Sequence, residues 1–390
     1  MTASHQKATV RVLSGQYFVY FAVLGLYLPF FNLWLHRLGF SGERIGAVSG
    51  VRSTAVVVMP LLWALAADRF KNRRALFVAA NLLAASLFAA YLFTQSFWPI
   101  LAITAVWAVF YAPIVSFMEA FAMEILGPER NQYGRVRVWG SASFIAVVLL
   151  AGWGVAAWGV WFILPAILAG SCIQAVLSLK FPDISADARM APRLSRQDLA
   201  HFRRPATLVF LVAAFLMLAS HGAYYGFYSI RLDELGYSGS FIGAMWALAT
   251  GAEVVVMVKS KAILDRFSPR AILCVSLFAA VARWGLLATA RNPAALIPIQ
   301  LLHALTYGTF HVASIVYIER LIPPAARTVG QAVNNAMTYG AGLAAGFAVT
   351  GLLWEPWGAA GCFVLAGGLA AAGGLLFVGE ILWERGRSRS

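Results

Sequence analysis

Long apolar stretches alternate with short polar ones from one end of the chain to the other. Most apolar stretches reach about 20 residues, the length that a helix needs to cross a hydrocarbon core ~30 Å thick. The pattern therefore predicts an all-α polytopic membrane protein with twelve spans. These spans are expected at residues 12–35, 44–67, 74–94, 97–123, 134–153, 157–180, 206–230, 240–261, 270–290, 294–320, 328–353 and 358–382.

The second half of the chain repeats the first. A shift of 197 residues aligns "GFSGERIGA" (39–47) with "GYSGSFIGA" (236–244) and "DRF" (68–70) with "DRF" (265–267). Two parallel six-helix repeats with a substrate site between them near the membrane midplane form a plan used by secondary transporters. A transporter is therefore expected.

The longest polar stretch falls near the middle of the chain and separates six spans from six. We therefore expect three parts: an N-terminal six-helix bundle, a cytoplasmic linker and a C-terminal six-helix bundle. Their predicted bounds are residues 1–180, 181–205 and 206–390.

Composition agrees with a membrane protein, because 61% of the residues are hydrophobic and only 12% are charged. The net charge of +14 is unevenly distributed. With the N-terminus inside, 23 of the 30 Lys and Arg residues fall in cytoplasmic segments or helix ends, and four fall in outside loops. This asymmetry predicts cytoplasmic termini rather than nucleic-acid binding. The expected location is a bacterial inner membrane. No cofactor or metal is expected, and the three cysteines are interpreted as packing residues.

Two charged residues interrupt the fourth and fifth spans, where a charge costs roughly 2.5–3.5 kcal/mol on insertion scales. Glu119 and Arg137 lie 18 residues apart across a short loop, at similar depths. We expect them to meet and to bind polar groups of a substrate. The alternative is a static ion pair, but buried pairs stabilise less than apolar packing does.

A second set of polar residues lies in spans eight to ten: Glu253, Arg283, His303 and His311. A carboxyl group in a low dielectric takes up a proton more readily, and a nearby arginine opposes this. Such a set can bind and release a proton according to which side of the membrane its cavity is open to water, so a proton-coupling role is predicted. For His311 alone, a hydrogen bond between helices is an equally good interpretation.

The segment "LWALAADRFKNRR" (62–74) resembles the loop between the second and third helices of the major facilitator superfamily. "VKSKAILDRFSPR" (258–270) repeats its Asp-Arg pair, and the first glycine of the family pattern is Ala64 here. A carboxylate at a helix end can hold a neighbouring element in one state and release it in another. We therefore expect gating roles for Asp68, Arg69, Asp265 and Arg266.

"MEAFAMEILGPERNQYGRVRVWG" resembles the lactose permease and related proton symporters. The resemblance assigns substrate binding to Glu119 and Arg137, and it matches Glu253, Arg283 and His303 to polar residues of helices eight to ten. The carboxylate that carries the proton in that family is replaced by Thr306. Glu253 or another acid must then carry the proton.

"SHGAYYGF" (220–227), "ARWG" (282–285) and "QLLHAL" (300–305) are similar to the 3-phenylpropionic acid transporter group. This resemblance implies proton-linked import of an aromatic carboxylate. The resemblance to the major facilitator superfamily implies a protein that works as a monomer. An arginine beside aromatic side chains suits such a substrate. We therefore assign substrate contacts also to Arg52, Tyr27, Tyr224 and Tyr225, although Arg52 can equally extend toward the outer surface.

Three other interpretations remain. The same fold can import a nucleoside or an oligosaccharide with protons, or it can export drugs or metabolites. The pair of Glu119 and Arg137 favours a specific polar substrate over an apolar efflux pocket. A membrane enzyme is disfavoured, because the sequence has no metal cluster, nucleophile motif or phosphate loop.

Overall fold

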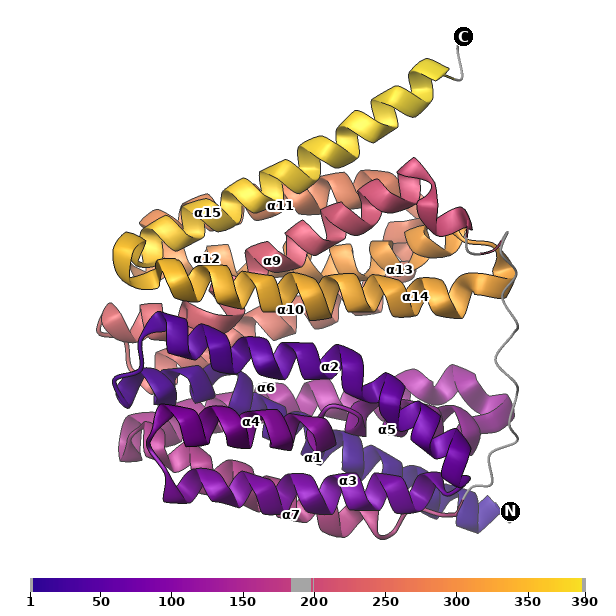
Figure 1. Cartoon of the computed structure of the whole chain (residues 1–390), viewed down its shortest axis with the longest axis vertical. Helices are drawn as coiled ribbons and strands as arrows, with labels where there is room; N and C mark the ends of the chain where they lie inside the picture. The colour runs from indigo at the N-terminus through magenta and orange to yellow at the C-terminus, as the bar shows by residue number, and fades with distance from the viewer. Residues whose placement is uncertain (1–2, 184–197, 199, 388–390) are drawn as a thin grey trace. The chain divides into compact units, whose positions relative to one another are not determined.

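A computed structural model describes residues 3–183, 198 and 200–387, which are almost entirely helical and contain no strand (Figure 1). The first half comprises α1 (Ala3–Arg37), α2 (Gly42–Phe70), α3 (Arg73–Phe88), η1 (Ala89–Phe93), α4 (Phe97–Tyr111), α5 (Ile114–Leu126), η2 (Gly127–Gln132), α6 (Tyr133–Trp158), η3 (Val160–Phe162) and α7 (Ile163–Ser178). Most of the predicted linker, residues 181–205, lies outside the described residues.

The second half comprises η4 (His201–Arg203), α9 (Pro205–Glu234), α10 (Gly239–Arg266), α11 (Pro269–Thr289), α12 (Pro293–Leu301), η5 (Ala304–Thr309), α13 (Phe310–Leu321), η6 (Pro324–Ala326), α14 (Arg327–Asn335), η7 (Ala336–Gly342) and α15 (Leu343–Arg387). Two of these elements, η5 and η7, are π-helices. The chain turns sharply within α15 at Gly358, where φ is +64°.

Eleven intervals of the described chain are helical, long and apolar enough to cross a membrane. The last interval, Pro324–Arg387, is 64 residues long and contains the turn at Gly358. It therefore holds the last two of the twelve predicted spans, and the predicted all-α polytopic fold is confirmed.

Local backbone structure follows the sequence repeat. Gly39 and Gly236, 197 residues apart, both have φ of +82°, a conformation that favours glycine. The side chain of Asn72 accepts a hydrogen bond from the first turn of α3, and that of Ser268 does the same for α11. Equivalent sequence signals therefore end and begin helices at equivalent places in both halves.

The chain folds into two compact units. Of the described residues, the first unit contains 3–40, 54–183 and 232–247, and the second contains 41–53, 198, 200–231 and 248–387. The bundle boundaries taken from the repeat, 1–180 and 206–390, stay a prediction.

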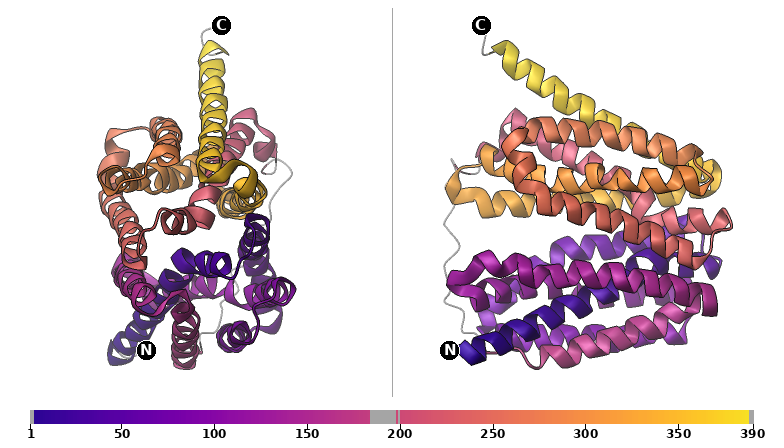
Figure 2. Two further views of the ribbon diagram at one scale, coloured as in Figure 1. Left: turned by 90° about the vertical axis from the view of Figure 1, so that its left-hand side faces the viewer. Right: turned by 180° about the vertical axis from the view of Figure 1, so that it is seen from behind.

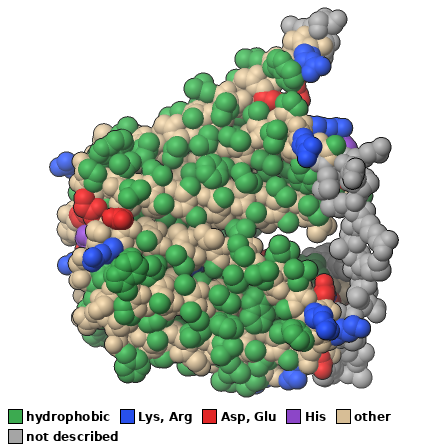
Figure 3. Space-filling view, in the orientation of Figure 1, with side chains coloured by type: hydrophobic (Ala, Val, Ile, Leu, Met, Phe, Trp, Pro, Cys, Tyr) green, Lys and Arg blue, Asp and Glu red, His purple; other side chains and the backbone are tan. Residues whose placement is uncertain are grey.

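In each unit, one helix packs extensively against two others. In the first unit, α1 packs against α6 and runs beside α7 (Figure 2). In the second, α11 packs against α15 and α13. Hydrophobic side chains cover the helices on the face drawn in Figure 3, and Lys and Arg gather toward the helix ends. This distribution suits helices whose middle parts face lipid and whose ends reach water.

Candidate functional site

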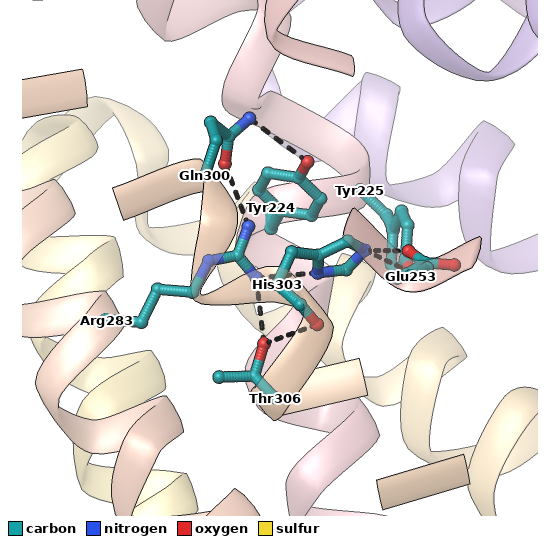
Figure 4. Close-up of polar contacts among 7 residues, drawn as sticks. All are labelled: Tyr224, Tyr225, Glu253, Arg283, Gln300, His303 and Thr306. Carbon is teal, nitrogen blue, oxygen red and sulfur yellow. Dashed lines mark hydrogen bonds and ion pairs between the residues drawn. The ribbon is translucent and has the colours of Figure 1, made fainter. Parts of the chain in front are cut away.

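The guanidinium of Arg283 forms the centre of a polar cluster in the second unit (Figure 4). Arg283 lies on α11 and is completely buried. Its Nη1 donates hydrogen bonds to His303 Nδ1 at 2.8 Å and to Thr306 Oγ1 at 3.1 Å, and its Nη2 donates to Gln300 Oε1 at 2.9 Å. A charge that costs several kcal/mol in an apolar environment is thus held by three oriented acceptors.

His303 connects this guanidinium to a carboxylate. Its Nε2 lies 2.5 Å from Oε1 of Glu253, which is on α10. Arginine can only donate, so His303 Nδ1 must accept from Arg283 and carries no proton. The imidazole is therefore neutral, with its proton on Nε2, and it donates that proton to Glu253. The three side chains form one directed chain of hydrogen bonds from Arg283 to Glu253.

Aromatic rings from α9 and α11 cover the cluster. The Arg283 guanidinium carbon lies 4.4 Å from the ring centre of Tyr224 and 4.7 Å from that of Trp284, both favourable cation–π distances. Tyr224 also accepts a hydrogen bond from Gln300 at 3.3 Å. The hydroxyl of Tyr225 lies 3.5 Å from His303 Nε2. The structure thus places two of the predicted aromatic residues beside the predicted charged residues.

The π-helix η5 determines how the histidines line up. The ring centres of His303 and Tyr307 lie 5.4 Å apart, and those of Tyr307 and His311 lie 6.1 Å apart, with both pairs stacked. His311 Nδ1 lies 2.6 Å from the hydroxyl of Tyr339, on the second π-helix η7. This column of rings places His303 and His311 on one side of their helical segment.

Glu119 and Arg137 occupy the first unit, on α5 and α6. Glu119 is exposed, and the two charges interact electrostatically. Among the residues that the structure describes, they form no ion pair. Instead, the guanidinium carbon of Arg137 lies 3.9 Å from the ring centre of Phe21. Gly140 makes room for this stack, because a Cβ there would come within 2.6 Å of Phe21 and 2.9 Å of Arg137.

Two further predicted substrate residues, Tyr27 and Arg52, are not among the residues of the cluster drawn in Figure 4. Tyr27 is buried on α1, where its ring stacks on Phe31 at 4.3 Å and on Trp107 at 5.3 Å. Tyr27 is therefore part of the packed core of the first unit. Arg52 is half-buried on α2 and falls in the second unit.

The two Asp-Arg pairs differ in their contacts. Asp68 lies 3.7 Å from Arg73, and Arg73 also forms an ion pair with Glu124 at 2.6 Å. These three side chains link α2, α3 and α5. Asp265 instead pairs with Lys261 on its own helix, at 2.6 Å. Both partner arginines of the motif, Arg69 and Arg266, are exposed.

In the second unit, the link between helices is made by Arg270 rather than by the Asp-Arg pair. Arg270 on α11 lies 2.5 Å from Glu384 on α15 and donates to the hydroxyl of Tyr317 at 3.1 Å.

Sequence reasoning alone does not assign several members of the main cluster. Gln300 and Thr306 hold the guanidinium, and their spacing of three residues on either side of His303 is the signal that could have found them. His221 is a further neighbour of the cluster, and it was assigned no role from the sequence. It is completely buried, its Nδ1 lies 2.8 Å from the carbonyl oxygen of Met217, and its ring centre lies 6.1 Å from that of His303.

The fold and the span count define a polytopic membrane protein, and sequence comparison identifies its family. The chain belongs to the MFS_1 like family, whose model matches residues 10–365. Over 363 residues it is 30% identical to the probable 3-phenylpropionic acid transporter of Escherichia coli (strain K12), covering 89% of this chain and 92% of that protein.

Two other similarities agree. The chain is 27% identical to the maltose permease of Geobacillus stearothermophilus, over 87% of this chain and 86% of that protein. Its fold matches the crystal structure of the nucleoside transporter NupG with a TM-score of 0.85 at 18% identity, covering 95% of this chain and 98% of that one. The relatives are therefore transporters of the major facilitator superfamily, and so is this protein.

Proposed function

We propose that the protein is a proton symporter that imports a small aromatic carboxylate, such as 3-phenylpropionate, by alternating access. Its setting is the bacterial inner membrane, with both termini in the cytoplasm. The observation that most supports this proposal is the chain of hydrogen bonds from buried Arg283 through neutral His303 to Glu253. A transporter with no proton to move has no evident need for a carboxylate linked to a buried cation.

Glu253 is the acid that we assign to proton binding. When it is ionised, its charge balances that of Arg283 through the imidazole. When it is protonated, the attraction is lost and the hydrogen bond from His303 weakens to one between neutral groups. The proton therefore changes the hydrogen bonding between α10, α11 and the start of η5, which is the differential interaction that a coupled conformational change requires. His311 and Tyr339 extend this polar path.

Substrate contacts are assigned separately to Glu119 and Arg137 in the first unit and to Tyr224 and Tyr225 in the second. Arg137 keeps its guanidinium stacked on Phe21 without a direct ion pair to a described carboxylate. Its donors can thus pair with a substrate carboxylate, and Tyr224 and Tyr225 offer ring faces. The 30% identity to a probable 3-phenylpropionic acid transporter favours an aromatic acid over other substrates.

An oligosaccharide or a nucleoside is the second candidate class of substrate. The 27% identity to a maltose permease favours a substrate rich in hydroxyl groups, to which Glu119 would bind as an acceptor. Proton coupling through Glu253 is the same in either case. Outward transport of any of these solutes is the remaining alternative.

The test is proton movement in proteoliposomes when 3-phenylpropionate, maltose or a nucleoside is added outside. We expect the external solution to become alkaline with 3-phenylpropionate alone. Glu253→Gln should lose this signal, whereas Glu234→Gln, a change at an exposed acid, should keep it. Alkalinisation with maltose or a nucleoside instead would mean that the substrate belongs to that class and is not an aromatic acid. Acidification of the exterior would indicate export.

A further inference from the structure

A basic pocket lies at the end of the second unit where α9 begins and α15 ends. Its volume is about 730 Å³, and it is lined by five arginines: Arg204, Arg270, Arg320, Arg385 and Arg387. Figure 3 shows Lys and Arg side chains gathered near this end of α15. These arginines come from four separate segments, so folding brings together charges that are far apart in the sequence.

The charge of the pocket is strongly unbalanced. Among its described lining residues, the only carboxylate is Glu384, and it is taken by Arg270 at 2.5 Å. Arg204, Arg320, Arg385 and Arg387 are exposed. Guanidinium groups that outnumber the acids around them attract an anion, and their planar donors fit the oxygens of a phosphate group.

The first turn of α9 adds neutral donors to the same pocket. Pro205, Ala206 and Thr207 all line it, at the N-terminus of a 30-residue helix. A helix N-terminus carries partial positive charge and N–H groups without partners in the helix, which bind phosphate. Thr207 is completely buried, and its hydroxyl has no hydrogen-bond partner among the described residues. Buried hydroxyl groups normally have a hydrogen-bond partner, so the unsatisfied Thr207 hydroxyl favours a bound anion that accepts its hydrogen bond.

The surroundings of the pocket favour a lipid as the source of this phosphate. Trp383 lines the pocket and is half exposed, with its ring under the guanidinium of Arg387 at 4.8 Å. Leu382, its neighbour on α15, is 60% exposed. Tryptophan and basic residues at the ends of spanning helices mark the level of lipid headgroups.

We propose that this pocket binds the phosphate group of an anionic phospholipid. The exposed arginines pair with the phosphate oxygens, and the N-terminus of α9 and Thr207 donate to them. The acyl chains lie along the apolar outer faces of the helices. No residue of the proposed transport cluster takes part, so the binding site is separate from Glu253 and Arg283.

The test is native mass spectrometry of the full, delipidated chain titrated with dioleoyl phosphatidylglycerol. The pocket variant is the triple change Arg204→Gln, Arg320→Gln and Arg385→Gln, which leaves Arg270 in place to hold Glu384. Its control removes the same charge at exposed positions outside the pocket, by Arg11→Gln, Arg135→Gln and Lys259→Gln. Thr207→Val removes one hydroxyl at nearly constant volume.

We expect one phosphatidylglycerol molecule to be retained by the parent and the control, and to bind about tenfold or more weakly to the pocket variant. Dioleoyl phosphatidylcholine should not distinguish the three proteins. Thr207→Val should weaken phosphatidylglycerol binding alone, and it carries the test if the triple variant does not fold. Equal loss in the control would overturn the proposal. Inorganic phosphate that binds tightly while the lipid does not would assign the pocket to a free anion instead.

Discussion

Arg283 shows how a buried charge can be kept in a membrane protein. Its three hydrogen-bond acceptors lie on one short segment, from Gln300 to Thr306, while the rings of Tyr224 and Trp284 cover its faces. This arrangement depends on the planar, forked guanidinium, which presents several donors in fixed directions. A lysine could carry the charge but could not reach all three acceptors.

Arg283→Lys should therefore reduce transport at least tenfold while the protein still folds. The ammonium group would leave at least one of the three buried acceptors without a donor. Initial rates of uptake in proteoliposomes measure the effect, and Arg291→Lys, at an exposed residue, is the control. Full activity of Arg283→Lys would mean that the fork geometry has no role.

At this scale, the sequence predicted the participants but not their contacts. Glu253, Arg283 and His303 are costly in apolar spans, and the structure brings them together. By contrast, the stack of Arg137 on Phe21 could not be foreseen, because a phenylalanine in a span is usually only a packing residue. It depends on space left by Gly140, and sequence alone does not reveal which glycine faces which ring.

At the scale of elements, the π-helices are the part of the fold that could not be predicted from the sequence. Hydrophobic periodicity is weak in helices that are apolar on all sides, so an extra residue in a turn leaves no visible signal. The extra residue in η5 sets the angular relation of His303 to His311. π-Helical turns are often found at functional sites.

Deletion of Leu305, an exposed residue of η5, should convert the π-turn into an α-turn. The segment after it would then rotate by about 100°, which removes Tyr307 from its place between the two histidines. We expect transport to be abolished with little loss of membrane-inserted protein. Leu305→Ala, which keeps the residue count, should transport normally; transport by the deletion variant would argue against a role for the π-turn.

Helix packing in the second unit depends on a close approach between α9 and α15. A Cβ on Gly346 would collide with the backbone of Ala219, and one on Gly222 would collide with the backbone of Gly346. Backbone atoms cannot move aside as a flexible side chain can. Small residues at such crossings are a usual feature of membrane helices.

Gly346→Ala should therefore lower the melting temperature of the purified protein by several degrees, since overpacking costs about 1–3 kcal/mol. Gly368→Ala, in the span that follows the turn at Gly358, is the control, because nothing lies within 4 Å of the position that its Cβ would take. Thermal unfolding in detergent followed by size-exclusion chromatography compares the two. Equal melting temperatures would contradict the close packing of α9 on α15.

At the scale of the whole molecule, the distribution of Lys and Arg predicts the orientation of the chain in the membrane. Of the 30 Lys and Arg residues, 23 belong to one predicted side of the membrane and four to the other. The repeat and the span count were readable from the sequence for a similar reason: length and charge bias act over many residues. Individual contacts depend on packing at single positions and are not readable in this way.

The orientation can be checked with reporter fusions in a bacterial host. We expect a fluorescent protein fused after Ser390 to fluoresce and alkaline phosphatase fused there to be inactive, because that end is predicted to be cytoplasmic. Alkaline phosphatase fused after Glu234 should be active. The opposite pattern at both positions would invert the predicted topology.

The directed bond from His303 to Glu253 also has an electrical consequence. With Glu253 ionised, its negative charge offsets that of Arg283, so the cluster has little net charge when it changes its access from one side to the other. With Glu253 protonated, the charge of Arg283 remains, and the transmembrane voltage acts on that step with ~2.3 kcal/mol per elementary charge for each 100 mV across the full membrane. The proton-loaded form is thus the one whose reorientation should respond to voltage.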